Sequence, residues 1–186
     1  LFAVLLTTSL FIAFIPMNVT ASSPWTELGS GASSDVEEPF VMAKSGDYLF
    51  IGDRYSSNFN LTIWDVSTPS NPTQVHSMSN PGEIHQITIK NDKMVVAVAN
   101  AGAKLYDVSD PTNPTLLHTD TTVGSAPRGA TLNADASIMY VWFSQQFSDD
   151  KVVAFDISNP SSPTELSRVS ALGNTGELRL TEDETT

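Results

Sequence analysis

The chain contains no cysteine, and lysine and arginine make up only 9 of its 186 residues against 21 aspartates and glutamates. The lack of cysteine excludes a disulfide framework, a thiolate metal site and a cysteine nucleophile. The formal net charge of −12, without any basic run, argues against nucleic acid or an anionic membrane as the main partner. Hydrophobic residues still form 40% of the chain, which excludes intrinsic disorder, and the length suits roughly one domain.

Catalytic signatures are missing as well. The sequence holds no G-x-S-x-G elbow, H-E-x-x-H pair, phosphate-binding loop or dinucleotide fingerprint. Serine, histidine and aspartate occur, but their spacing singles out no catalytic triad. We therefore assign no catalytic residue, no metal ligand and no cofactor. The sequence favours a protein that is not an enzyme, without excluding one.

Residues 1–21 are predicted to be a signal peptide. Leu1 to Met17 are almost wholly apolar and uncharged, and the small residues Val19 and Ala21 then match a signal-peptidase site cut after Ala21. The alternative is an uncleaved anchor, for which this run is at the short limit of a spanning helix. A basic start and an initiator Met are missing, so we expect a sequence that begins part-way into its gene. The mature chain is expected to be secreted, extracellular or at the cell surface (or periplasmic), and not inserted in a membrane.

A repeat organises residues 40–186, after a linker over residues 22–39. Three segments align without gaps: LTIWDVSTPSNPTQV from Leu61, AKLYDVSDPTNPTLL from Ala103 and VVAFDISNPSSPTEL from Val152. Two apolar runs precede each segment, the segment itself begins with a third run that ends at the Asp, and a fourth run follows the prolines. Each unit of roughly 42 residues therefore predicts a four-stranded antiparallel sheet, the size of a β-propeller blade. We predict an all-β propeller fragment of about three blades plus the first strand of a fourth.

The aspartates Asp65, Asp107 and Asp156 stand 42 and 49 residues apart at the same place in each unit. An Asp that closes a strand can accept from the backbone N–H two residues later, and the Ser there reinforces this turn. The first proline fixes φ, and the second delays pairing until the fourth strand begins. The repetition favours this structural role over the alternative of three cation-binding carboxylates.

The strings IWDVSTPSNP, LYDVSDPTNP and AFDISNPSSP resemble the LVIVD repeat of secreted and cell-surface bacterial and archaeal β-propellers. The resemblance covers roughly Phe40 to the end of the chain. It implies the propeller fold, and it carries over no catalytic motif, because the family is defined by its repeat. Aromatic residues stand where the family has aliphatic ones before the Asp, which alters packing more than chemistry.

Loops on one face of a propeller join the second and third strands of each blade, and one blade to the next. Those after the second strand are long in the first and third units, RYSSNFN from Arg54 and QQFSDD from Gln145. Long loops in a regular repeat indicate a binding surface, although neutral drift in length is the alternative. Asp149 and Asp150 lack the Asp-x-Asp spacing and glycine typical of a calcium loop. The loop candidates for binding are Arg54, Tyr55, Gln145, Gln146, Asp149 and Asp150.

His85 and Arg128 occupy aligned positions where the innermost strands begin, at the mouth of the channel, with Gly176 in the next partial unit. These side chains could bind an anion or act as acid and base. The alternative for a His without an evident carboxylate partner is solvent exposure or a hydrogen bond to the backbone. His76 and His118 recur on outer strands and are poor ligand candidates.

These features predict an exported binding module whose partner is a protein or a glycan. One alternative is a channel-centred enzyme of the lactonase or hydrolase type, using His85 and Arg128. Another is a structural module of a larger surface protein. Since closed propellers have at least four blades, we expect about half of a larger ring, prone to aggregation when expressed alone. The oligomeric state stays open.

Overall fold

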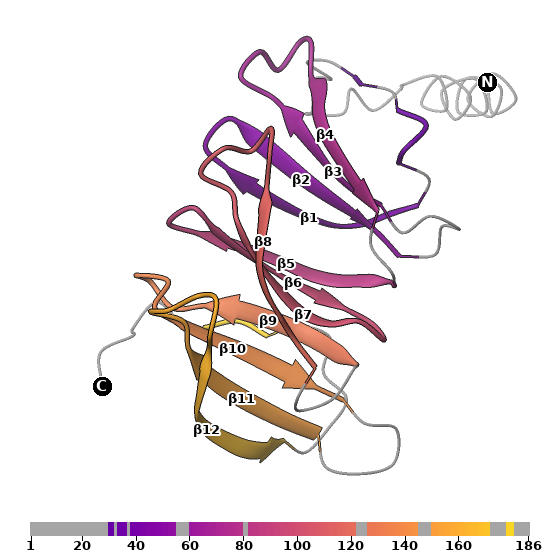
Figure 1. Cartoon of the computed structure of the whole chain (residues 1–186). Helices are drawn as coiled ribbons and strands as arrows, with labels where there is room; N and C mark the ends of the chain where they lie inside the picture. Colours follow the sequence, from indigo (N-terminus) through magenta and orange to yellow (C-terminus); the bar gives the residue numbers. More distant parts are fainter. Residues whose placement is uncertain are drawn as a thin grey trace, which may run out of the picture.

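The computed structural model describes residues 30–31, 33–36, 38–54, 60–79, 82–121, 126–144, 150–171 and 178–180. The predicted signal peptide and most of the predicted linker lie outside these residues. The described chain forms twelve strands in three antiparallel four-stranded sheets, stacked in sequence order (Figure 1). In the part described there is no helix long and apolar enough to cross a membrane.

Every sheet is built from strands that are consecutive in sequence. The first contains β1 (Pro39–Ser45), β2 (Tyr48–Asp53), β3 (Asn60–Asp65) and β4 (Thr73–Ser79). The second contains β5 (Ile84–Lys90), β6 (Lys93–Val98), β7 (Gly102–Asp107) and β8 (Thr115–Asp120). The third contains β9 (Pro127–Leu132), β10 (Ile138–Phe143), β11 (Asp150–Asp156) and β12 (Thr164–Ala171). Neighbouring sheets meet along their first strands, because β5 contacts both β1 and β9. This arrangement confirms the predicted propeller blades, with β1, β5 and β9 innermost.

The turn between the third and fourth strands is the same in all three blades. The backbone N–H of the Ser two residues on donates to Oδ1 over 2.8 Å in each case, for Asp65, Asp107 and Asp156. A β-turn with proline at its second position follows; in the first blade it is closed by the Asn71 N–H on the Thr68 carbonyl, 2.9 Å apart. Proline suits this position because its φ is already that of the turn. The geometry is the turn that the repeated motif predicts.

The blades pack through alternate residues of their strands. On β6, Met94, Val96 and Val98 face the first sheet, and Val95 and Ala97 belong to the cluster shared with the third sheet. All five side chains are buried, so this middle strand reads as a continuous apolar run. Two apolar layers, one on each side of the second blade, thus hold the three sheets together.

Each innermost strand contains one extra residue near its start. In the second blade, Ile84 pairs with Val98 and Gln86 with Ala97, so His85 has no partner on β6. The same shift leaves out Phe40 in β1 and Arg128 in β9. A β-bulge re-aims a side chain and increases the local twist of its strand. The three bulges therefore place three different side chains at equivalent points on the same edge of the stack.

Residues 178–180, predicted as part of the first strand of a fourth blade, are assigned to no strand. Leu178 lies beside the innermost strands, where its carbonyl accepts from Gln86 Nε2 over 2.9 Å and its N–H donates to Gln86 Oε1 over 3.3 Å. Gly129 leaves room for this contact, since a Cβ there would stand 3.0 Å from that of Leu178. The carboxamide of Gln86 thus makes the two hydrogen bonds to Leu178 that the backbone of a neighbouring strand would otherwise make.

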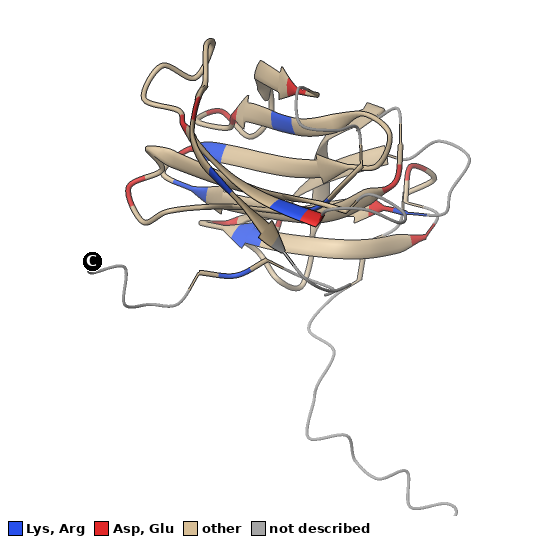
Figure 2. Cartoon of the chain, turned by 90° about the horizontal axis from the view of Figure 1, so that it is seen from below, with Lys and Arg blue, Asp and Glu red and all other residues tan. Residues whose placement is uncertain are grey.

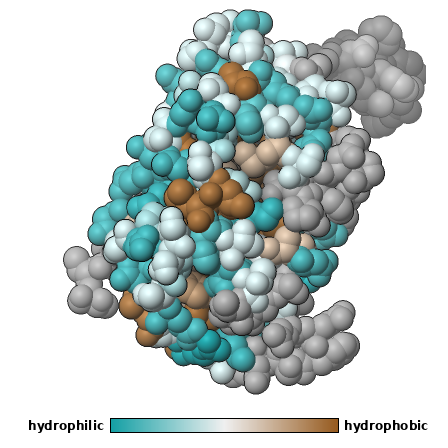
Figure 3. All heavy atoms as spheres, in the orientation of Figure 1, coloured by the Kyte–Doolittle hydropathy of each residue, from teal (hydrophilic) through white to brown (hydrophobic). Residues whose placement is uncertain are grey.

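Acidic residues lie mainly at turns and strand ends, and basic residues are scattered singly (Figure 2). The face in Figure 3 is mostly hydrophilic, with apolar residues in separate groups. The large exposed apolar side chains among the described residues are Phe40, Met42, Leu116, Leu166 and Val169. Single exposed apolar side chains of this kind are normal for a folded protein.

Candidate functional site

The site that we describe lies at the end of the stack where β2 finishes and where β5 and β9 begin. We call it the channel mouth and define it by Phe40, Arg54, Glu83, His85 and Arg128. Backbone hydrogen bonds hold its connections: the N–H of Ala99 donates to the Glu83 carbonyl over 2.8 Å, and that of Arg54 to the Glu38 carbonyl over 3.3 Å. Side chains from the innermost strands of all three blades meet there.

His85 and Arg128 are paired across the boundary between the second and third blades. Nη1 of Arg128 lies 3.0 Å from Nε2 of His85. A guanidinium can only donate, so Nε2 of His85 must accept, and the ring proton is then on Nδ1. The imidazole in this pair is therefore neutral. Its side chain is only 6% exposed, so the imidazole is largely shielded from solvent.

Glu83 connects this pair to Arg54 from the first blade. Its Oε2 lies 3.6 Å from Nε of Arg54 and 3.6 Å from Nε2 of His85. The guanidinium of Arg54 also stacks over the Phe40 ring, 4.3 Å from its centroid. Arg54, Glu83, His85 and Arg128 thus form a continuous row of polar side chains.

The environment keeps His85 neutral. Burial lowers its pKa to about 4, and the positive charges of Arg128 and Arg54 act in the same direction, against the opposing charge of Glu83. Among the five residues that define the channel mouth, two guanidiniums and one carboxylate sum to one net positive charge. This contrasts with the strongly acidic chain around it.

The two guanidiniums differ in their partners. Arg54 faces the carboxylate of Glu83, whereas Arg128 pairs with no carboxylate in the described part of the chain. Arg128 is partly exposed, and its hydrogen bond to His85 occupies one N–H of the fork. The arrangement can bind an anionic group, and it holds Arg128 in place for that purpose.

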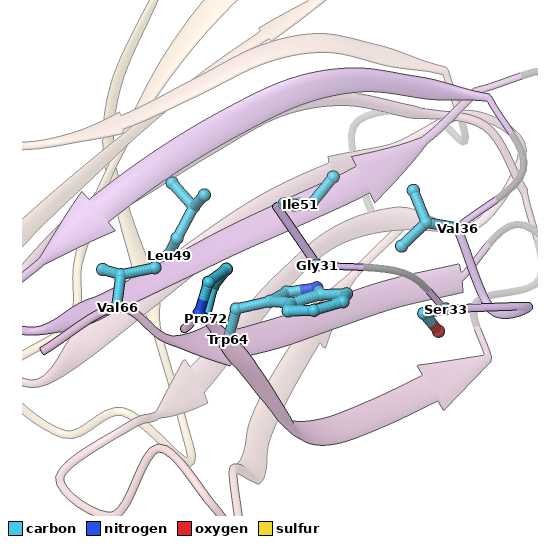
Figure 4. A pocket seen from close by; sticks show the side chains of 8 residues that line it. All are labelled: Gly31, Ser33, Val36, Leu49, Ile51, Trp64, Val66 and Pro72. Atoms are coloured by element: carbon cyan, nitrogen blue, oxygen red, sulfur yellow. The ribbon is translucent and has the colours of Figure 1, made fainter. Parts of the chain in front are cut away.

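A second feature lies on the free face of the first blade. A cavity of about 340 Å³ is lined on one side by Gly31, Ser33 and Val36, in the segment before β1, and on the other by residues of β2 and β3. Figure 4 shows the Trp64 indole beneath Gly31, with Leu49, Val66 and Pro72 toward one end and Ser33 and Val36 toward the other. Asp35 anchors this segment, because Gln74 Nε2 donates to its Oδ2 over 2.8 Å and Asn60 Nδ2 to its carbonyl over 2.9 Å. The cavity is mostly apolar and lies apart from the channel mouth.

The structure brings together three of the predicted site residues, Arg54, His85 and Arg128. Asp150 is the first residue of β11 and pairs with Ala171. The other loop candidates lie outside the described residues; these are Tyr55, Gln145, Gln146 and Asp149. Within the described ranges, no group of three or more His, Asp or Glu side chains could hold a metal ion.

Sequence reasoning missed Glu83 and Phe40. Glu83 stands in the connection between the first two blades, beside the end of β2 in the neighbouring blade. A signal for it was available, because the loops after a second strand and those between blades share one face of a propeller. Phe40 was detectable from its alignment with His85 and Arg128. His76, set aside as peripheral, contacts the next blade: its Nδ1 lies 3.0 Å from the Thr112 carbonyl oxygen.

The family model for the LVIVD repeat matches residues 42–80, 81–122 and 147–171. A comparison with curated proteins finds no match. These three stretches together cover more than half of the chain.

Solved structures show a similar arrangement of strands. The computationally designed Ika4 protein is 14% identical over 86% of this chain and 89% of that one, with a TM-score of 0.61. The computationally designed Ika8 protein is 13% identical over 76% of this chain, with a TM-score of 0.58. A protein from Lactobacillus plantarum is 14% identical over 75% of this chain, with a TM-score of 0.53. The chain spans only 40% of Ika8 and 41% of the Lactobacillus protein. At these identities the likeness shows the fold alone.

Proposed function

Because the chain belongs to the LVIVD repeat family and folds into propeller blades, we propose that it is an exported binding module that acts outside the cell through its channel mouth. The observation that carries this proposal is the row formed by Arg54, Glu83, His85 and Arg128. Side chains from three blades converge there, and the Arg128 guanidinium is partly exposed. The partner is a protein or a glycan on a surface.

The geometry favours binding over acid–base catalysis. A general base needs a lone pair that can reach the proton it removes. In His85 the lone pair of Nε2 accepts from Arg128, and the other ring nitrogen carries the proton. A hydrolase that used this His would have to break the pair first, so we do not adopt that alternative.

Export is supported by the apolar run over residues 1–17 and the small residues that follow it. The test is a fusion of residues 1–40, with an added start codon, to a phosphatase that is active only outside the cytoplasm. We expect an active phosphatase, with the new N-terminus after Ala21, and no activity when residues 1–21 are deleted. Equal activity of both fusions would contradict export by this segment.

Binding is tested with the whole chain, recovered after export and carrying a fluorescent label. It is applied to arrayed glycans and to arrayed surface proteins. We expect a defined set of ligands that is lost in the double variant Arg54→Gln and Arg128→Gln. The matched control is Arg168→Gln, an arginine on β12 that pairs with Glu165 away from the channel mouth. Binding that the double variant retains would place the ligand elsewhere, and a folded chain that binds no ligand would refute the proposal.

A further inference from the structure

We propose that the channel mouth recognises a carboxylate group of its ligand, with the Arg128 guanidinium as the main contact. This inference rests on the proposed function and names the chemistry that it leaves open. An acidic sugar is the ligand class that fits it.

The Arg128 guanidinium has N–H donors that can bind an anion. A guanidinium presents five N–H groups in a planar fork, and this geometry suits two-point binding of an oxyanion. His85 engages Nη1 of this fork, and within the described residues no carboxylate engages the rest. Arg128 is partly exposed, so a ligand can reach it from the mouth.

The Arg128 side chain is held in place before a ligand binds. Arg128 lies on the bulge near the start of β9, and its Nη1 is hydrogen-bonded to the buried imidazole of His85 on the neighbouring blade. Holding a long side chain in one place costs conformational entropy, which here has already been lost on folding. A ligand that binds this fork therefore loses less free energy to side-chain ordering than one that binds a mobile surface arginine.

The charge of the channel mouth suits a carboxylate better than a phosphate. Arg54 and Arg128 contribute two positive charges and Glu83 one negative charge, while His85 is neutral. One net positive charge matches a carboxylate monoanion. A phosphate dianion would leave excess negative charge beside Glu83, in an already acidic protein, and like charges at close range repel.

The Phe40 ring can contact the part of the ligand beyond its carboxylate. The Phe40 ring lies next to Arg54 in the channel mouth and is 48% exposed. The exposed part of this ring offers an apolar surface to the C–H face of a sugar. A glycan longer than one sugar can place its carboxylate on Arg128 and another of its rings on Phe40. This favours an acidic sugar over an acidic peptide as the ligand.

The test is a titration of the whole exported chain, followed by NMR of the arginine side chains at pH 7. The probes are D-glucuronate, D-glucose, inorganic phosphate and an acidic peptide of aspartates. We expect glucuronate to shift the Arg128 signals with a Kd of about 1 mM, the range of a small ligand with few contacts. Glucose, phosphate and the peptide should bind at least about tenfold more weakly.

Variants assign the contact. Arg128→Gln should weaken glucuronate binding about tenfold or more, the usual effect of losing a hydrogen bond to a charged group. Arg128→Lys should bind glucuronate with an affinity between those of Arg128→Gln and the unchanged chain, since lysine keeps the charge but lacks the planar fork of N–H donors. Arg168→Gln is the control and should bind as the unchanged chain does. Because Arg128→Gln also removes the hydrogen bond to His85, Arg54→Gln serves as a second variant that keeps both partners of that bond. Urea unfolding shows that each variant is folded.

Three results would overturn the inference. They are phosphate or the peptide binding as tightly as glucuronate, glucose binding equally well, or glucuronate binding unchanged in Arg128→Gln. A chain that binds arrayed ligands through its channel mouth but not glucuronate would refute this inference alone. A chain that binds nothing on the arrays would refute the proposed function itself.

Discussion

The Arg128 guanidinium donates a hydrogen bond to Nε2 of His85 on the neighbouring blade, over 3.0 Å. The bond joins two bulge residues that lie 43 positions apart in the sequence. It holds the imidazole in one tautomer, and it links the innermost strands of two sheets that share no backbone ladder. The stability of the blades and the charge of the channel mouth are therefore connected through one side-chain pair.

The first prediction is that stability falls in mild acid because of His85. Its pKa is lowered from an ordinary 6.5 to about 4, so between these values the unfolded chain binds a proton that the folded chain does not. The free energy of unfolding should be unaffected by this group above pH 6.5. It should decrease as the pH falls from about 6.5 to about 4, by up to about 3 kcal/mol.

The measurement is urea unfolding between pH 4 and pH 8. His85→Gln keeps a neutral side chain and should flatten the slope in this window, while Arg54, Glu83 and Arg128 remain around it. His118→Gln, on the outer strand β8, is the matched control and should keep the slope. Identical slopes for His85→Gln and the unchanged chain would contradict the assignment.

The second prediction concerns the repeated turn. Asp107→Ala removes the acceptor of the Ser109 N–H and should lower the free energy of unfolding by about 1 kcal/mol. Asp107→Asn keeps a side-chain oxygen and should lower the free energy of unfolding by less. Asp47→Ala is a control, since no hydrogen bond of that side chain occurs among the described residues. Urea unfolding at pH 7 measures all three, and an equal loss in Asp47→Ala would refute the turn argument.

Acid should remove the same contribution. The hydrogen bonds from the backbone N–H and the hydroxyl of Ser109 lower the pKa of Asp107. For a carboxyl with a lowered pKa, the stabilisation is complete above the ordinary value near 3.8 and is lost as the pH falls through the folded pKa. The difference between Asp107→Asn and the unchanged chain should therefore narrow below about pH 4.

The third prediction concerns Gly129. An added Cβ there would stand 2.8 Å from Gln86 Oε1 and 3.0 Å from the Leu178 Cβ, so Gly129→Ala should displace residues 178–180. Overpacking of this kind costs about 1–3 kcal/mol when the neighbours cannot move. Amide hydrogen exchange at Leu178 should speed up in Gly129→Ala and also in Gln86→Ala, which removes the hydrogen bonds without a clash. Unchanged exchange in both variants would show that the contact is not maintained in solution.

The fourth prediction concerns the connection between β10 and β11, most of which lies outside the described residues. Shortening residues 145–149, which precede β11, to the length of the second blade's connection should leave the melting temperature nearly unchanged. The cost of closing a loop varies slowly with length, by about 0.6 kcal/mol for each doubling. A large drop, measured by thermal unfolding, would show that the loop packs as part of the core.

The blades followed from the sequence because their signals are local. The Asp, Ser and two prolines around Asp65, Asp107 and Asp156 act within one turn, and alternation of apolar residues acts within one strand. Three copies then confirm one another. Local chemistry repeated at a regular spacing was enough to identify the fold and to locate His85 and Arg128 at one edge.

The pairing within the channel mouth could not be obtained in the same way. Glu83 contacts Arg54 and His85 only because the sheets stack at a particular angle, and a bulge shifts His85 off the pattern of its strand. Likewise, nothing in the sequence ties Gln86 to Leu178, since an amide side chain can bond in many ways. These contacts depend on inter-blade geometry, which strand periodicity does not carry.

Each described sheet is made of four strands that follow one another without interruption. A recombination event between Ser79 and Glu83, or between Asp120 and Ala126, would therefore add or remove a complete blade without separating any strand from its ladder partner. Genes of this design can change their number of blades by unequal crossing-over while every hydrogen-bonded sheet remains whole.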